Sequence, residues 1–238
     1  MATRPDTPHT KKHSNALAGI LKVVTAVAIF PILTAGVFFV AAGRFDWTWV
    51  WVYLGINLAN VLVVGPITIR INPSTIAEHD GPKKTEKWDV GSVFYLLATY
   101  IALPLVAGLD VRFGWARDLS IACNVAGGSV FAVGLGLVSW VMTTNPYIWS
   151  EAPIQHGQTV CSTGPYRLVR HPAYAGLILQ ALGVPILLGS LWALIPGIAA
   201  AVCIIIVTSS EDRILQAELP GYQDYVQKVR FRLVPGIW

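Results

Sequence analysis

The chain has 238 residues, of which 54% are hydrophobic and only 13% are charged. A soluble domain usually carries about a quarter charged residues, so this composition argues against a soluble globular protein. The net charge of +4 comes from basic residues at the ends of apolar segments rather than from one basic face, which argues against a nucleic-acid-binding protein.

Six apolar segments follow one another along the chain, and most approach the 20 or so residues that a helix needs to cross a bilayer. They cover residues 17–42, 47–69, 90–109, 119–142, 174–188 and 191–208. Only Gly189 and Ser190 separate the last two, which predicts a tight helical hairpin. We therefore predict an all-α polytopic membrane protein with about six transmembrane helices. Residues 1–15 form a polar basic tail, 16–142 a four-helix transmembrane region, and 143–238 the hairpin with a C-terminal cytosolic segment.

The distribution of lysine and arginine predicts how the segments are oriented. These residues gather in the N-terminal tail, the second loop, the loop before the hairpin and the C-terminal segment, whereas Arg44, Arg112 and Arg117 fall on the other side. The positive-inside rule places both termini in the cytoplasm, and in a bacterium the protein would lie in the inner (plasma) membrane. No predicted span carries a buried Asp, Glu or Arg, which argues against a channel or an ion-coupled transporter.

Several common site signatures are absent from the sequence. The three cysteines, Cys123, Cys161 and Cys203, form no C-x-x-C pair, which argues against a zinc site, and we predict no metal. There is no P-loop, no H-E-x-x-H and no G-x-S-x-G motif. Gly134 and Gly136 lie inside the fourth apolar segment, where glycine serves helix packing rather than dinucleotide binding.

The stretch from Gly164 to Gly176 concentrates basic and aromatic residues at the start of the hairpin. Pro172 suits the first position of a helix, because its missing N–H needs no partner there. The free N–H groups of that helix end, next to Arg170 and His171, would favour an anionic ligand group. The alternative is that this stretch only anchors the protein at the membrane interface.

A pair of acidic residues, Glu211 and Asp212, follows the sixth apolar segment. Because the hairpin is tight, we expect this pair to return to the same membrane face as His171. Acids that face a basic cluster in a partly desolvated place are typical of ligand-binding sites. The alternative is that the pair marks the solvated end of a membrane helix.

Together these stretches resemble the isoprenylcysteine carboxyl methyltransferase family and its bacterial relatives. The family pattern G-P-Y-x-x-x-R-H-P-x-Y-x-G is present from Gly164 to Gly176, followed by the hairpin and the acidic pair. A Y-x-x-Y pair (Tyr222 and Tyr225) and an R-x-x-P pair (Arg232 and Pro235) complete the resemblance, which covers residues 143–238. One departure is Val207, which stands where the family usually has arginine.

The resemblance implies an enzyme that uses S-adenosylmethionine as methyl donor, bound in a pocket that is not a Rossmann fold. It implies donor-binding roles for Tyr166, Arg167, His171, Pro172, Tyr174, Gly176, Glu211, Tyr222 and Tyr225. It implies catalytic roles for Arg170, Glu211 and Arg213. The acceptor would be a lipophilic small molecule or a prenylated group with an isoprenylcysteine-like carboxylate, reached from among the membrane lipids.

Three other functions stay open from the sequence alone. A membrane methyltransferase could act on a small thiol or on a phospholipid amine. A reductase of the sterol-reductase type has a similar C-terminal region and uses NADPH. A non-catalytic membrane scaffold would need the polar cluster only as an anchor. Binding of S-adenosylmethionine, of a nicotinamide nucleotide or of neither compound separates the methyltransferases, the reductase and the scaffold.

Overall fold

The computed structural model of the protein describes residues 29–71, 90–116, 119–145, 147, 154 and 157–238, and all regular elements there are helical. These elements are the helix Ile29–Ala42, α2 (Thr48–Ile71), α3 (Val90–Leu97), the π-helical turn η2 (Ala98–Ala102), α4 (Leu103–Phe113), α5 (Ile121–Thr144), the 3-10 turn η3 (Gly164–Arg167), α6 (Pro172–Leu188), α7 (Leu194–Glu218) and α8 (Tyr222–Lys228). The predicted all-α class is confirmed. The predicted tail 1–15 and the first part of the first apolar segment lie outside the described residues.

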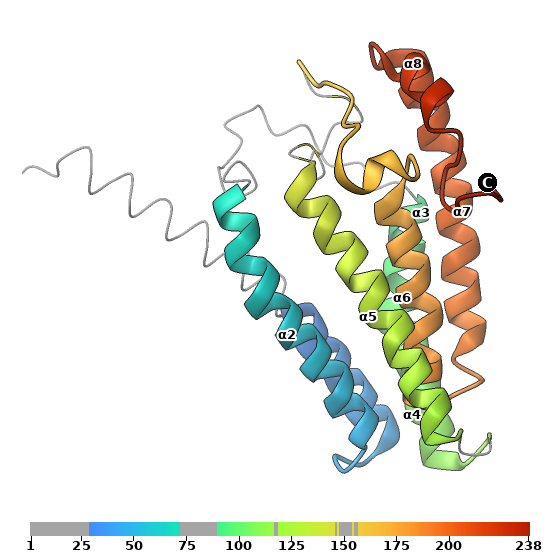
Figure 1. Ribbon diagram of the computed structural model, residues 1–238. Helices are drawn as coiled ribbons and strands as arrows, with labels where there is room; N and C mark the ends of the chain where they lie inside the picture. The colour runs from blue at the N-terminus through green and yellow to red at the C-terminus, as the bar shows by residue number, and fades with distance from the viewer. Residues whose placement is uncertain (1–28, 72–89, 117–118, 146, 148–153, 155–156) are drawn as a thin grey trace, which may run out of the picture.

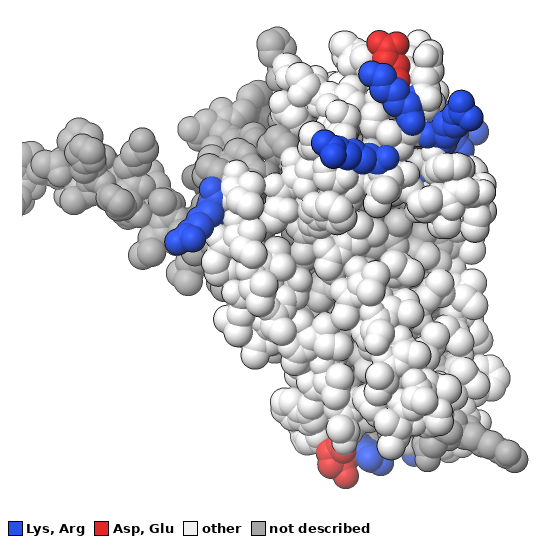
Figure 2. All heavy atoms as spheres, viewed as in Figure 1, with Lys and Arg blue, Asp and Glu red and all other residues white. Residues whose placement is uncertain are grey.

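The bundle presents an apolar surface of membrane-crossing length. Four helical segments are long and apolar enough to cross a bilayer: Thr48–Ile67, Val90–Phe113, α5 and α7. The helix Ile29–Ala42 and α6 are apolar but shorter. Figure 2 shows charged side chains at the two ends of the bundle and none on the visible band between them. The chain is therefore an integral membrane protein, as its composition predicted.

Two helices extend beyond the limits that the sequence suggested. α7 continues to Glu218, beyond the apolar segment 191–208, because residues 209–218 contain several good helix formers that carry the helix past the polar boundary. The third span continues to Phe113 and includes Asp110, which is buried. The expectation that no span carries a buried acid was therefore wrong. Asp110 accepts hydrogen bonds from the Ser190 hydroxyl at 2.6 Å and the Ala116 N–H at 2.8 Å.

Helices α5 and α6 lie against one another along a seam of glycines. A Cβ atom on Gly134 would lie 2.6 Å from the backbone oxygen of Gly176, and one on Gly183 would lie 2.6 Å from the backbone nitrogen of Phe131. Such distances leave no room for a side chain, so the two backbones are in direct contact, as small residues allow in membrane helices. The glycines predicted to serve packing do so at Gly134, whereas Gly136 faces open space.

The apolar core lies mostly at the end of the bundle opposite the C-terminal segment. There Phe38, Tyr53, Leu103, Phe131 and Leu187 pack together from five different helices. Figure 1 shows that α2 and the helix Ile29–Ala42 converge with the other helices at this end and diverge from α5 at the other. The core therefore fixes the bundle at one end, and the polar segments gather at the other.

A short turn joins α7 to α8 and creates a small separate core. Pro220 follows Leu219, which has an extended backbone, and Gly221 turns the chain with a φ of 80°. The residue before a proline avoids helical geometry, and glycine tolerates a positive φ, so this sequence ends one helix and starts the next. Leu219, Tyr222 and Tyr225 then form a buried cluster against the loop that precedes α6. α8 is thereby held over the end of the bundle (Figure 1).

Candidate functional site

The loop before α6 and the polar end of α7 meet at the same end of the bundle. η3 begins at Gly164, whose φ is 55°, and places Pro165 in a buried position. α6 then begins at Pro172 with His171 as its N-cap, which confirms the start predicted from the proline. The tight hairpin returns α7 to this level, so Glu211 and Asp212 lie beside His171 and Tyr174, as expected.

Asp212 is the centre of the charged cluster. Its side chain is fully buried, and each of its two carboxylate oxygens accepts three hydrogen bonds. Oδ1 accepts from Arg170 Nε at 2.9 Å, Tyr222 Oη at 3.0 Å and His171 Nε2 at 3.1 Å. Oδ2 accepts from Gln216 Nε2 at 2.8 Å, Arg232 Nε at 2.9 Å and Arg170 Nη2 at 3.0 Å. A buried carboxylate is tolerated only when it is paired and hydrogen-bonded in this way.

The hydrogen-bonding groups of Arg170 are also mostly used within the protein. Besides the fork that it forms with Asp212, its Nη1 donates to the backbone oxygens of Val229 at 3.0 Å and Arg230 at 2.8 Å. The side chain is only 5% exposed. A guanidinium that already makes four hydrogen bonds within the protein has little capacity left for a ligand. The bonds of Arg170 link α7 to the segment after α8, and its predicted catalytic role stays a prediction.

Glu211 has a different environment from its neighbour. It is half-buried, and it accepts a hydrogen bond from the Tyr174 hydroxyl. The Tyr174 ring lies parallel to the His171 ring, with centroids 5.9 Å apart. Successive helix residues point about 100° apart, so Asp212 faces the protein interior while Glu211 faces the start of α6. Glu211 is thus the acid of the pair that could meet a ligand.

Three tyrosines predicted to bind the donor are built into the protein around this cluster. Tyr222 and Tyr225 are buried, and Tyr225 Oη donates to the backbone oxygen of Tyr166 at 2.6 Å. Asn145 in turn donates to Tyr166 Oη at 2.8 Å. Burial, together with the neighbouring Asp212 charge, raises the pKa of Tyr222 well above its usual range. Burial likewise raises the pKa of Tyr166 and of Tyr225, so all three hydroxyls are neutral at physiological pH.

The remaining predicted residues fall into two groups. Pro172 and Gly176 are buried in the first turns of α6, where Gly176 contacts α5 and so supports the site through helix packing. Arg167 and Arg213 are exposed. The structure does not bring these two arginines into the Asp212 cluster, and their roles stay predictions.

Sequence reasoning left several members of the cluster out of its site residues. Asp212 was recognised as part of the acidic pair but not as its centre, and Arg232 was recognised only as part of a motif. Gln216 could have been found from its spacing, because it lies one helical turn after Asp212 and donates to it. Asn145 lies at the end of α5, and its bond to Tyr166 could not be read from the sequence.

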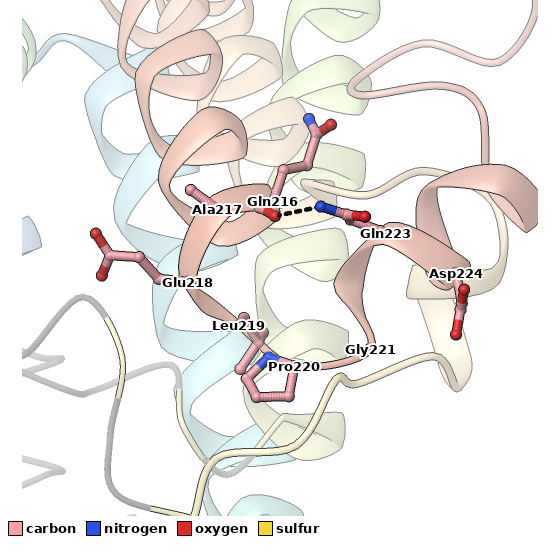
Figure 3. Close-up of a pocket in the computed structure, with 8 residues that line it drawn as sticks. All are labelled: Gln216, Ala217, Glu218, Leu219, Pro220, Gly221, Gln223 and Asp224. Carbon is pink, nitrogen blue, oxygen red and sulfur yellow. Dashed lines mark hydrogen bonds between the residues drawn. The ribbon is translucent and has the colours of Figure 1, made fainter.

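A shallow hollow lies on the outer side of the turn between α7 and α8. Figure 3 shows it lined by this turn, with the Gln223 amide donating to the backbone oxygen of Gln216 at 3.2 Å. Glu218 and Asp224 point away from one another at its rim. The residues that line it include Gln216, which donates to Asp212, but not Arg170, His171 or Asp212 itself. In the described part of the chain, no group of three or more His, Cys, Asp and Glu side chains could hold a metal ion.

A family of known enzymes matches this part of the chain. The sequence model of the family described as phospholipid methyltransferase matches residues 122–219, which extend from the first turn of α5 to the end of α7. No curated protein matches the sequence significantly. The matched segment covers less than half of the chain but includes His171, Tyr174, Glu211 and Asp212. The protein is therefore a membrane methyltransferase. The match supports the resemblance to isoprenylcysteine methyltransferases only as far as both are membrane methyltransferases.

Proposed function

We propose that the protein transfers a methyl group from S-adenosylmethionine to a lipophilic acceptor at the end of the bundle where α6 begins. The observation that carries this proposal is that the segment matching a methyltransferase family also contains most of the residues that form the charged site. The segment that matches a methyltransferase family contains the two stretches, around His171 and Glu211, that lie together in the folded chain. The match favours a methyltransferase over the NADPH-dependent reductase and the scaffold.

The residues present fit the polar groups of the donor. Glu211 is half-buried and carries a negative charge that Tyr174 only partly satisfies, which suits the donor's ammonium group. The start of α6 at Pro172, beside His171, offers the positive end of a helix to the donor's carboxylate. The partly exposed Tyr174 ring would face the adenine or the sulfonium. Tyr222 and Tyr225 are buried, so we assign them to the wall that supports these groups.

Methyl transfer makes modest demands on the protein. The bound donor supplies an electrophilic methyl group, whose bond to sulfur breaks as the acceptor's lone pair forms the new bond. No covalent nucleophile is needed, so alignment and exclusion of water provide most of the rate. Asp212 fixes Arg170 and His171 with bonds of 2.9–3.1 Å, and this rigid backing would hold the Glu211 face in one geometry.

The charges around the cluster help to decide which class of acceptor fits the site. An isoprenylcysteine-like carboxylate needs a free cation, yet Arg170 is bound to Asp212 and to two backbone oxygens. The family arginine is replaced by Val207, one helical turn before Glu211. A phospholipid amine needs no such cation, and the matched family is described by phospholipid methylation. We therefore rank a phospholipid amine first among the candidate acceptors, a carboxylate second and a small thiol third.

An amine or thiol acceptor would also require the loss of a proton, unlike a carboxylate. That proton would pass to water, because Glu211 is assigned to the donor's ammonium. We propose further that both termini face the cytoplasm. The basic residues flanking the predicted spans support this orientation, which would give the donor access from the cytosol.

The test is titration of the detergent-purified protein with S-adenosylhomocysteine by calorimetry. Wild-type protein should bind, and Glu211→Gln should bind at least tenfold more weakly. Glu218→Gln is the matched control, because Glu218 is an exposed acid on the same helix. Folded wild-type protein that does not bind would refute the proposal. Transfer of labelled methyl groups to phosphatidylethanolamine vesicles, compared with a prenylcysteine analogue and a small thiol, then decides the acceptor.

A further inference from the structure

The chain after α8 folds back onto the charged cluster. We call residues 229–238 the C-terminal strap, and it lies beyond the segment that matches the methyltransferase family. Its backbone pairs with the loop before α6: the Arg170 N–H donates to Phe231 and the His171 N–H donates to Arg232, each at 2.9 Å. Figure 1 shows the strap turning away from α8 and running back beside α7. The strap therefore holds the two residues that precede α6.

Arg232 connects this strap to the centre of the cluster. Its Nε donates to Asp212 Oδ2 at 2.9 Å, and its Cζ lies over the Trp238 ring, 5.0 Å from the centroid. The Arg232 side chain is 27% exposed, whereas Asp212 is fully buried. An indole beneath a guanidinium attracts the positive charge and removes water from one of its faces. Trp238 therefore limits the water contact and the rotation of Arg232.

Trp238 is itself held in place by the backbone of the strap. Its backbone oxygen accepts hydrogen bonds from the N–H groups of Arg232, Leu233 and Val234, at 2.8, 3.0 and 3.1 Å. Gly236 turns the chain with a φ of 83°, which favours glycine, and the Trp238 N–H donates back to Val234. This closed loop presents the indole to Arg232. A loop so constructed acts as a clamp on one side chain.

We infer that Trp238 is a positioning residue of the methyl-donor site. It holds Arg232 against Asp212, and Asp212 holds His171 at the start of α6. Its effect on donor binding rests on the proposed function, but its effect on the strap does not. Trp238 lies outside the matched segment and outside the motifs that suggested a methyltransferase. The connection is visible only in the folded chain.

The experiment combines substitutions at Trp238 with two measurements. Trp238→Ala and Trp238→Leu should raise the Kd for S-adenosylhomocysteine by about three- to thirtyfold, the range that cation–π contacts support. Trp238→Phe keeps an aromatic face and should stay within about threefold of wild type. Ile237→Ala is the control, because Ile237 is the neighbouring residue and is 79% exposed. In an Arg232→Ala background, Trp238→Ala should add no further loss, because the two residues act through one contact.

The second measurement is amide hydrogen exchange without any donor. The N–H groups of Arg170 and His171, which donate to the strap, should exchange faster in Trp238→Leu than in Trp238→Phe or wild type. If wild type does not bind S-adenosylhomocysteine, the proposed function fails, and the exchange result still decides the role of the strap. Leucine and phenylalanine variants with equal exchange and equal affinity would overturn the inference.

Discussion

Replacement of Asp212 by asparagine tests whether the charged cluster is the structural centre of the site. The substitution keeps the shape of the side chain but removes the charge that faces Arg170 and Arg232. It also replaces one carboxylate oxygen by an NH₂ group, which cannot accept hydrogen bonds. Whichever oxygen is replaced, the three groups that donate to it lose their acceptor. Removing one partner of a buried ion pair costs about 3–5 kcal/mol. For a chain of this size, that loss corresponds to a fall in Tm of roughly 6–20 °C.

Thermal unfolding in detergent micelles, followed by tryptophan fluorescence, measures the effect. Glu211→Gln is the matched control, because it makes the same chemical change at the adjacent residue, which is half-buried and accepts a hydrogen bond from Tyr174. It should cost no more than about 1.5 kcal/mol, the usual net value of one hydrogen bond. The expected pattern is a large stability loss for Asp212 and a binding loss for Glu211. An Asp212→Asn protein that melts within about 2 °C of wild type would refute the reasoning.

Three further substitutions, the first with a control substitution beside it, test other parts of the fold. Gly183→Ala places a Cβ 2.6 Å from the α5 backbone and should lower Tm by several degrees, whereas Gly136→Ala, which meets open space, should not change Tm measurably. Tyr222 has a pKa raised above its usual 10 in the folded chain, so stability is full below pH 10 and falls above it by about 1.4 kcal/mol per pH unit; Tyr222→Phe should make thermal unfolding less sensitive to pH in that range. Ser190→Ala removes a 2.6 Å hydrogen bond to Asp110 and should cost about 1.5–3 kcal/mol of unfolding free energy in a denaturant titration.

The membrane helices and the place of the site follow from local features of the sequence. Apolar runs of sufficient length predict the helices, and Pro172 predicts where α6 begins, because proline is favoured in a helical first turn. The two-residue separation between the last apolar segments predicts that Glu211 returns to the level of His171, and the structure confirms it. These predictions succeed because each depends on neighbours in the chain.

The division of roles between the two acids could not be predicted in the same way. Asp212 collects its partners from the loop before α6, from α8 and from the C-terminal strap, and Arg232 is twenty residues away along the chain. No periodic pattern encodes such contacts, since they depend on how α8 and the strap fold back. Arg213 illustrates the same limit: it adjoins Asp212 in sequence but is exposed, because each residue turns the helix by about 100°. The course of α7 through the bundle was predictable from the sequence, but its rotation about its own axis, which decides which residues face the interior, was not.

The contrast between the two acids also explains how such a site would suit a cationic donor. The positive charge on the donor's sulfur disappears as the methyl group leaves, so a strong anion placed beside it would stabilise the starting state more than the transition state. Asp212 is buried against Arg170 and Arg232, and its charge is therefore balanced before any ligand arrives. Glu211 remains to hold a group remote from the reaction, such as the donor's ammonium. Donor binding would then depend on Glu211, whose charge is left for the ligand. The geometry of the site would depend on the adjacent Asp212, whose charge is balanced within the protein.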